Sequence, residues 1–187
     1  MSTRTSTKAS SLPVTPDAML QLKITIQGLR PAIWRRVAVP ASATFTGLHG
    51  VIQGALGWEN YHLHSFSHDQ REIAGRRRLY EVFDRVRARV EYLYDFGDSW
   101  AHQVTLEKVL PADPSDRQPK VLAGEHACPP EDCGGVWGYA ELLEILDDPS
   151  HPEYDERMAW VGGSWDPEQF DLEEANARLP RLRLPKS

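Results

Sequence analysis

Two runs of alternating residues, joined by a short turn, constrain the fold more than any other feature of the sequence. Successive side chains of a β-strand point to opposite faces, so period-two runs predict half-buried strands. One run lies at 86–96 and the other at 100–110. In the first, one face carries Val86, Ala88, Val90, Tyr92, Tyr94 and Phe96, and the other carries Arg85, Arg87, Arg89 and Glu91. Residues 95–99, with the sequence DFGDS, predict a hairpin turn in which Gly97 takes a backbone geometry most residues avoid.

The remaining patterns extend this hairpin into a larger sheet with helices. Alternation predicts strands at 20–26, 33–39 and 61–68, with Pro40 ending the second. Thr44 as N-cap and Gly57 as C-terminal cap predict a helix between them, and its three glycines predict a close approach to the sheet. Helices are also expected at 137–147 and 171–179. The fold class is therefore α+β, with a mostly antiparallel sheet packed with one central helix, plus a helical C-terminal part.

Length and composition bound the organisation of the chain. A chain of 187 residues is the size of one domain. We expect a disordered Ser/Thr-rich tail at 1–18, a single domain at 19–180 and a tail at 181–187. The apolar stretches are shorter than the ~20 residues that span a bilayer, and the N-terminus lacks the apolar core of a signal peptide. These features predict a cytoplasmic protein that does not enter the membrane.

Charge is distributed unevenly. Residues 1–123 hold 16 Lys/Arg and 12 Asp/Glu, whereas residues 124–178 hold 2 and 15. The acidic segment would repel phosphate, which disfavours a broad nucleic-acid surface. Such a surface would have to use the arginines of the first part, namely Arg71, Arg76, Arg77, Arg78, Arg85, Arg87 and Arg89. The alternative interpretation of these arginines is a solvated strand face and loop.

An ordered series of short motifs resembles the plasmid pRiA4b ORF-3-like family. They are YDFGDSW with His102 at 94–102, CPPED at 128–132, and GG and GY at 134–135 and 138–139. Earlier motifs at 48–49, 57–58 and 62–66 and later ones around 160, 170–171 and 176 also fit, so the resemblance covers about residues 18–180. It implies a protein of bacteria or archaea, often found on plasmids or insertion elements, without an established activity. Some members carry a resolvase label, but a resolvase's arginine-rich catalytic domain and helix-turn-helix have no match here.

Histidines are concentrated on two of the predicted strands. Alternation places His62, His64, Phe66 and His68 on one strand face. Histidine is a common metal ligand, but same-face neighbours on a strand are ~7 Å apart, so the competing interpretation is one core histidine with the others at the surface. His102 interrupts an apolar face and needs a partner, for which Asp95 and Asp98 are the candidates. Such a pair is either a rigid hairpin clamp or half of an acid–base site.

The loop at 126–135, with the sequence HACPPEDCGG, is the strongest local signal. Its prolines and glycines predict a fixed shape. Cys128, Cys133 and His126 offer thiolate and imidazole ligands of the kind zinc accepts, with His64 or His102 (or His62) as a further ligand. The spacing is not the usual two-residue gap between thiols, and the alternative is a rigid loop with buried thiols. Six tryptophans are many for this length and hint at a groove for a peptide or small ligand.

Three functional hypotheses follow. The first is a binding or accessory module for an unknown protein or small molecule. Its candidate site consists of Asp95, Asp98, Trp100, His102, Glu131 and Asp132, beside Cys128. The second is a zinc-dependent hydrolase whose metal ligands come from His64, His102, His126, Cys128 and Cys133, with Glu131 or Asp98 activating water. The third is a DNA-associated accessory protein. The first two require the turn at 95–99 and the loop at 126–135 to meet in space.

Overall fold

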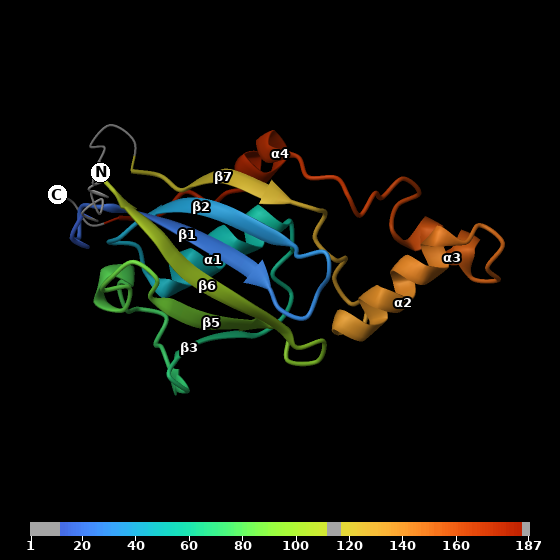
Figure 1. Cartoon of the computed structure of the whole chain (residues 1–187), viewed down its shortest axis with the longest axis horizontal. Coiled ribbons are helices and arrows are strands. Elements are labelled where there is room, and N and C mark those ends of the chain that lie inside the picture. Colours follow the sequence, from blue (N-terminus) through green and yellow to red (C-terminus); the bar gives the residue numbers. More distant parts are fainter. Residues whose placement is uncertain (1–11, 112–116, 185–187) are drawn as a thin grey trace, which may run out of the picture.

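One antiparallel sheet organises the part of the chain that the structure, a computed structural model, describes, residues 12–111 and 117–184. The strand order is β4-β3-β5-β6-β1-β2-β7, and Figure 1 labels each of these strands except the two-residue β4. The strands are β1 (Met19–Ile26), β2 (Trp34–Pro40), β3 (His64–His68), β4 (Arg71–Glu72), β5 (Arg89–Tyr94), β6 (Trp100–Leu110) and β7 (Lys120–Glu125). The helices are α1 (Phe45–Leu56), the short 3-10 helix η1 (Leu79–Glu81), α2 (Gly135–Asp147), α3 (Tyr154–Trp160) and α4 (Leu172–Ala177). The predicted α+β class is confirmed.

The predicted hairpin is present, with one strand shorter than expected. β6 has the predicted bounds and pairs with β5, Tyr94 lying opposite Trp100. β5 begins only at Arg89, after Arg87 adopts a φ of 73°, which interrupts the extended backbone. Phe96 was expected on the buried face with Tyr94, but it lies in the turn and is 52% exposed. Alternation could not reveal where pairing stops.

Helix α1 begins and ends where its caps predict. The Thr44 side chain accepts a hydrogen bond from the Gly47 amide at 3.1 Å, and Gly57 takes a φ of 89° at the other end. The apolar side of α1, including Phe45, Leu48 and Ile52, is buried in one cluster with the inner face of the sheet. This cluster is the core of the molecule.

The glycines of α1 do not face the sheet, contrary to expectation. They contact the C-terminal segment, residues 178–182, that runs back along the helix. A Cβ at Gly54 would lie 2.7 Å from the Arg178 carbonyl oxygen, and one at Gly47 would lie 3.3 Å from the Leu182 side chain. Leu182 also donates its amide hydrogen to the Gln118 side chain at 2.9 Å. The small residues therefore make room for this return segment, which includes the first residues of the predicted tail at 181–187.

Four elements were not predicted from the sequence, namely the short β4 and η1 and the longer β7 and α3. β7 forms the edge beside β2, and its Val121 exchanges two hydrogen bonds with the Asn176 side chain of α4, at 2.9 and 3.0 Å. α3 follows α2, and the two helices extend from one end of the sheet in Figure 1. The predicted C-terminal helix is shorter than expected and is capped, as expected, by Asp171, whose side chain accepts from the Glu174 amide at 2.8 Å.

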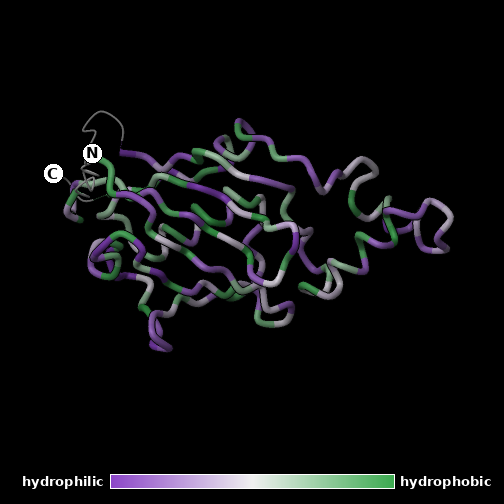
Figure 2. Tube along the Cα trace, in the orientation of Figure 1, coloured by the Kyte–Doolittle hydropathy of each residue, from purple (hydrophilic) through white to green (hydrophobic). Residues whose placement is uncertain are grey.

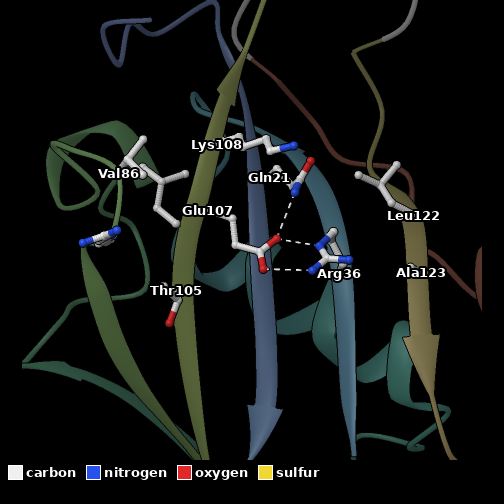
Figure 3. Close-up of a pocket in the computed structure, with 10 residues that line it drawn as sticks. Gln21, Arg36, Val86, Thr105, Glu107, Lys108, Leu122 and Ala123 are labelled. Atoms are coloured by element: carbon white, nitrogen blue, oxygen red, sulfur yellow. Dashed lines mark hydrogen bonds and ion pairs between the residues drawn. The ribbon is translucent and has the colours of Figure 1, made fainter. Parts of the chain in front are cut away.

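The outer face of the sheet is polar and open. Hydrophilic and hydrophobic segments alternate along the strands in Figure 2. On this face Arg36 bonds to both carboxylate oxygens of Glu107, at 2.5 and 3.0 Å, and Gln21 donates to the same carboxylate at 2.9 Å, as Figure 3 shows. In residues 12–111 and 117–184, no helix is both long and apolar enough to cross a bilayer.

Several of the arginines considered for nucleic-acid binding bond within the chain. Arg78 donates to the Ser42 carbonyl at 2.8 Å and Arg85 pairs with Asp84 at 2.9 Å. Arg77 contacts Glu81 one helical turn later. These contacts support the interpretation of this region as a solvated surface with local ion pairs.

Candidate functional site

The turn between β5 and β6, residues 95–99, is fixed by its first aspartate. Asp95 has a φ of 54°, a left-handed conformation that Asp tolerates better than most residues. Its Oδ1 accepts hydrogen bonds from the amides of Gly97 at 2.9 Å and Asp98 at 3.3 Å. These bonds hold the carboxylate, which is buried, so that its other oxygen points away from the turn. We call residues 95–99 the aspartate turn.

The loop at 126–135, which we call the cysteine loop, packs directly against the aspartate turn. Asp98 Oδ2 accepts the Gly134 amide hydrogen at 3.0 Å. A Cβ at Gly135 would lie 2.3 Å from the Asp98 carbonyl oxygen, and Gly135 has a φ of 67°. Only glycine permits both that backbone conformation and that approach. The two segments singled out in the sequence thus meet.

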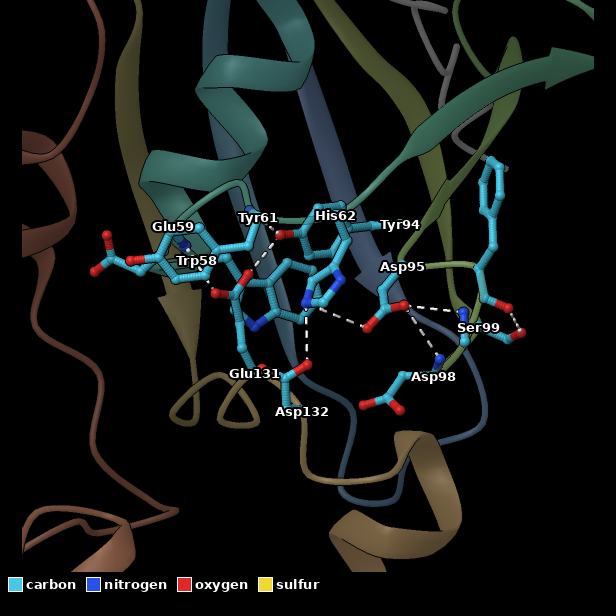
Figure 4. A network of polar contacts seen from close by, with 12 residues as sticks. Trp58, Glu59, Tyr61, His62, Tyr94, Asp95, Asp98, Ser99, Glu131 and Asp132 are labelled. Carbon is cyan, nitrogen blue, oxygen red and sulfur yellow. Dashed lines mark hydrogen bonds and ion pairs between the residues drawn. The ribbon is translucent and has the colours of Figure 1, made fainter.

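A second connection runs from the cysteine loop to β5. Tyr94 donates its hydroxyl hydrogen to Glu131 Oε1 at 2.5 Å and accepts the Tyr61 amide hydrogen at 3.1 Å. The Glu59 amide donates to Glu131 Oε2 at 3.3 Å, and these contacts are drawn in Figure 4. Burial and the neighbouring Glu131 carboxylate raise the pKa of Tyr94 above its usual range, so the phenol remains protonated. Glu131 is therefore held by neutral donors.

His62 faces the carboxylates of both segments. Its Nε2 lies 3.0 Å from Asp132 Oδ1 and 3.6 Å from Asp95 Oδ2, and Figure 4 shows the ring between the two side chains. These three ligand atoms lie within 4.8 Å of one another. We call His62, Asp95 and Asp132 the carboxylate–histidine cluster. Asp95 and Asp132 were among the predicted site residues, whereas His62 was named only as an alternative ligand, because alternation grouped it with His64.

His102 and Trp100 lie beneath the site and are both 1% exposed. His102 was expected to pair with Asp95 or Asp98, but its Nδ1 lies 3.3 Å from the Tyr92 carbonyl oxygen instead. Burial lowers its pKa to about 4, so the imidazole is neutral. Alternate residues at the start of β6 are buried, so His102 lies in the core with the apolar residues of its face, Trp100 and Val104. Trp100 and His102 support the site, and neither is placed to contact a ligand.

The histidines predicted as zinc ligands are dispersed. His64 stacks on His49, with ring centroids 3.5 Å apart. His126 Nδ1 lies 3.2 Å from Glu168 Oε2, and His102 lies in the core. Among the described residues, the carboxylate–histidine cluster is the one group of three or more such side chains close enough to share an ion. The structure therefore does not bring the predicted His/Cys ligands together at a single centre.

The two thiols remain free and protonated. Cys128 and Cys133 form no disulfide. Burial raises the pKa of the Cys133 thiol to about 12 and that of Cys128 further still. Both side chains are partly buried and pack against the hydrophobic core cluster, where a neutral thiol behaves as a small apolar side chain.

A cleft of about 720 Å³ opens beside the cysteine loop. Its walls are the end of α1 with Trp58 and Glu59, residues 127–131 of the cysteine loop, and the segment 160–178. Four of its lining residues are aromatic, namely Trp58, Trp160, Trp165 and Phe170. We call this feature the tryptophan cleft. Trp58 donates its indole hydrogen to the Pro129 carbonyl at 2.9 Å, which fixes the cysteine loop against the end of α1.

Acidic side chains outnumber basic ones in the tryptophan cleft. The acidic residues are Glu59, Glu131, Asp166, Asp171 and Glu174, and the basic ones are Arg35 and Arg178. Arg35 is buried and donates to four backbone carbonyls, those of Trp34, Ala55, Glu125 and His126, at 2.8 to 3.0 Å. Arg178 pairs with Glu174. Both guanidinium groups are thus already bonded within the protein.

Comparisons with known proteins give one family model and two similar proteins. The model of the plasmid pRiA4b ORF-3-like protein family matches residues 18–174. An uncharacterized protein of Sinorhizobium fredii (strain NBRC 101917 / NGR234), y4hQ, is 37% identical over 179 residues, which is 88% of this chain and 89% of the relative. The crystal structure of a protein of unknown function from Methanosarcina mazei Go1 is 38% identical, with a TM-score of 0.77. The match covers 86% of this chain and 98% of the chain of that structure.

Proposed function

The chain belongs to the plasmid pRiA4b ORF-3-like family, and from that premise we propose that it is a binding module whose tryptophan cleft receives a positively charged peptide segment of a partner protein. The observation that carries this proposal is the composition of the cleft. It combines aromatic walls with an excess of carboxylates, while both of its guanidinium groups are bonded within the chain.

The aromatic walls suit a cationic side chain. A Lys or Arg side chain can place its charge over a tryptophan face and its methylene groups against the ring. Trp160 is 47% exposed at the end of α3 and is available for such a contact. Trp58 is buried and stacks on Tyr94 with ring centroids 4.9 Å apart, so it forms the rigid floor.

The charge of the surrounding chain favours the same ligand. Residues 124–178, which supply most of the cleft, contain 15 acidic and 2 basic residues. Such a field attracts cations and repels phosphates, so it favours a basic peptide over a nucleic acid. A peptide also suits the size of the cleft, because about 720 Å³ exceeds what a single side chain fills.

The test uses a ten-residue peptide of alternating Lys and Gly, with a Glu/Gly peptide of the same length as the negative probe. We expect the full chain to bind the Lys peptide at low ionic strength, with affinity falling as salt rises, and not the Glu peptide. Trp160→Ala should weaken binding by about tenfold, an expected loss for removing a desolvated cation–aromatic contact. Isothermal titration calorimetry measures each affinity.

Trp137→Ala is the matched control. Trp137 lies on α2, is 87% exposed and does not line the cleft. Its loss should leave the affinity unchanged. Absence of Lys-peptide binding at low ionic strength, or equal weakening by the two tryptophan variants, would refute the proposal.

A further inference from the structure

The carboxylate–histidine cluster brings three ligand atoms together from three separate segments. His62 lies just before β3, Asp95 begins the aspartate turn, and Asp132 lies in the cysteine loop. The three atoms fall within 4.8 Å of one another. Ligand atoms at about 2.0–2.2 Å from one tetrahedral ion lie roughly 3.3–3.6 Å apart. The distances from His62 Nε2 to the Asp132 and Asp95 oxygens, 3.0 and 3.6 Å, are close to this range. The spacing therefore matches a shared centre.

The hydrogen bonds within the described part of the chain leave the His62 imidazole without a partner at Nε2. His62 Nε2 is shielded from solvent and, despite its 3.0 Å distance to Asp132 Oδ1, has no hydrogen bond of acceptable geometry. One imidazole nitrogen carries at most one proton and cannot serve two carboxylates at once. The described ion pairs of Asp95 and Asp132 are with His62 alone. Two carboxylates so close repel each other unless a cation lies between them.

The ligand atoms are also held in position before any ion binds. The amides of Gly97 and Asp98 hold Asp95 Oδ1 and leave Oδ2 facing His62. Asp132 follows Glu131, whose Oε1 accepts a hydrogen bond from the Tyr94 hydroxyl at 2.5 Å. A site whose ligands are already oriented loses little conformational entropy on binding.

We propose that His62, Asp95 and Asp132 bind a divalent first-row transition-metal ion. One imidazole and two carboxylates form a donor set suited to zinc, cobalt or manganese, whereas magnesium prefers oxygen ligands in an octahedral shell. Three protein ligands leave coordination positions for water or a bound group. Asp132 is 67% exposed, so those positions open to solvent. The proposal is independent of the peptide proposal, because it rests on other residues.

The test is a titration of the full chain, freed of metal by a chelator, with Co²⁺ and with Zn²⁺. We expect one equivalent of each ion to bind, and Co²⁺ to give weak visible bands without the intense near-ultraviolet absorption of thiolate–cobalt bonds. That spectrum separates the cluster from Cys128 and Cys133 without altering either thiol. A thiolate–cobalt band, or no saturable binding of either ion, would overturn the proposal.

Variants locate the ion. His62→Gln and Asp132→Asn should each weaken Co²⁺ binding by at least tenfold. His68→Gln is the matched control, since His68 Nε2 lies 3.5 Å from Asp69 Oδ2 in an exposed histidine–carboxylate pair outside the cluster. It should bind as the unmodified chain does. Equal binding by His62→Gln and the unmodified chain, both with native circular dichroism spectra, would assign the ion elsewhere and overturn the proposal.

Discussion

His62 and His64 are two residues apart and were expected on one strand face, yet the fold gives them different surroundings. His64 begins β3, and its ring stacks on His49 with an interplanar angle of 5°. Burial lowers the pKa of His64 below its ordinary value. His62 precedes the strand and faces Asp95 and Asp132. The partners supplied by distant segments, and not the spacing along the strand, distinguish a packed imidazole from a candidate ligand.

The same contrast extends to two regions of the molecule. In the core, His49 contacts the Tyr92 hydroxyl at 2.8 Å and the Asn60 side chain at 2.7 Å, both neutral groups. His102 is enclosed by Tyr92 and Trp58. At the site, by contrast, an imidazole meets carboxylates. The core stabilises neutral imidazoles, whereas the carboxylates of the site would favour a bound metal cation.

The largest expected effect is the response of the core histidines to acid. Burial lowers the pKa of His49 and of His102 to about 4, against an unfolded value of about 6.5. Between these values the unfolded state binds more protons, so the free energy of unfolding is fully retained above about pH 7 and falls as pH decreases toward 4. The loss approaches roughly 3 kcal/mol for each histidine. Urea unfolding at intervals from pH 7.5 to 4.5 measures it.

Variants assign this acid sensitivity to the core. His49→Gln should reduce the slope of stability against pH between 6.5 and 5, whatever its effect at pH 7.5. His68→Gln, at an exposed histidine, should leave the slope unchanged. Glu107, whose pKa is lowered by its hydrogen bond to Arg36, contributes mainly below this window. A stability that stays constant from pH 7 to 5 would contradict the neutral-core interpretation.

The next largest effect is expected where the cysteine loop touches the aspartate turn. In Gly135→Ala the new Cβ would meet the Asp98 carbonyl at 2.3 Å and would also be strained at a φ of 67°. We expect a loss of about 2–4 kcal/mol, because backbone on both sides must move. Chemical denaturation measures the loss, and Co²⁺ titration measures whether Asp95 and Asp132 have separated.

Gly162→Ala measures the cost of backbone strain without the steric overlap that is expected at Gly135. Gly162 also has a left-handed backbone, with a φ of 91°, but a Cβ there meets nothing within 4 Å. Its substitution should cost only the conformational strain, about 1 kcal/mol. Equal losses from the two variants would mean that the close approach at Gly135 contributes nothing to the site.

Local signals in the sequence were sufficient for much of the fold. The caps at Thr44 and Gly57 and the alternation from Trp100 to Leu110 are decided by residues next to one another, and these elements appear as predicted. β7 and α3 were missed because neither has a strong periodicity of its own. β7 depends on pairing with β2 and on the Asn176 side chain, which lies 55 residues away from Val121.

The two segments that form the candidate site were predicted from the sequence, but the histidine that joins them was not. Turn chemistry identified residues 95–99, and prolines with glycines identified residues 126–135. Which histidine meets them depends on where β3 begins, and a shift of two residues exchanges His62 for His64. His102 was misassigned for a related reason, since alternation gives its face but not the depth of the core beneath it.

The smallest expected effect bears directly on the two neighbouring histidines. In the presence of a chelator, His62→Gln should change the free energy of unfolding by less than about 0.5 kcal/mol, because His62 Nε2 makes no hydrogen bond. His64→Gln should cost about 1–2 kcal/mol, since it removes the ring stacked on His49. With saturating Zn²⁺ the unmodified chain should become more stable and His62→Gln should not, because an ion stabilises only a protein that binds it. If His62→Gln instead costs as much as His64→Gln under chelation, His62 is a packing residue and the contrast between the two histidines fails.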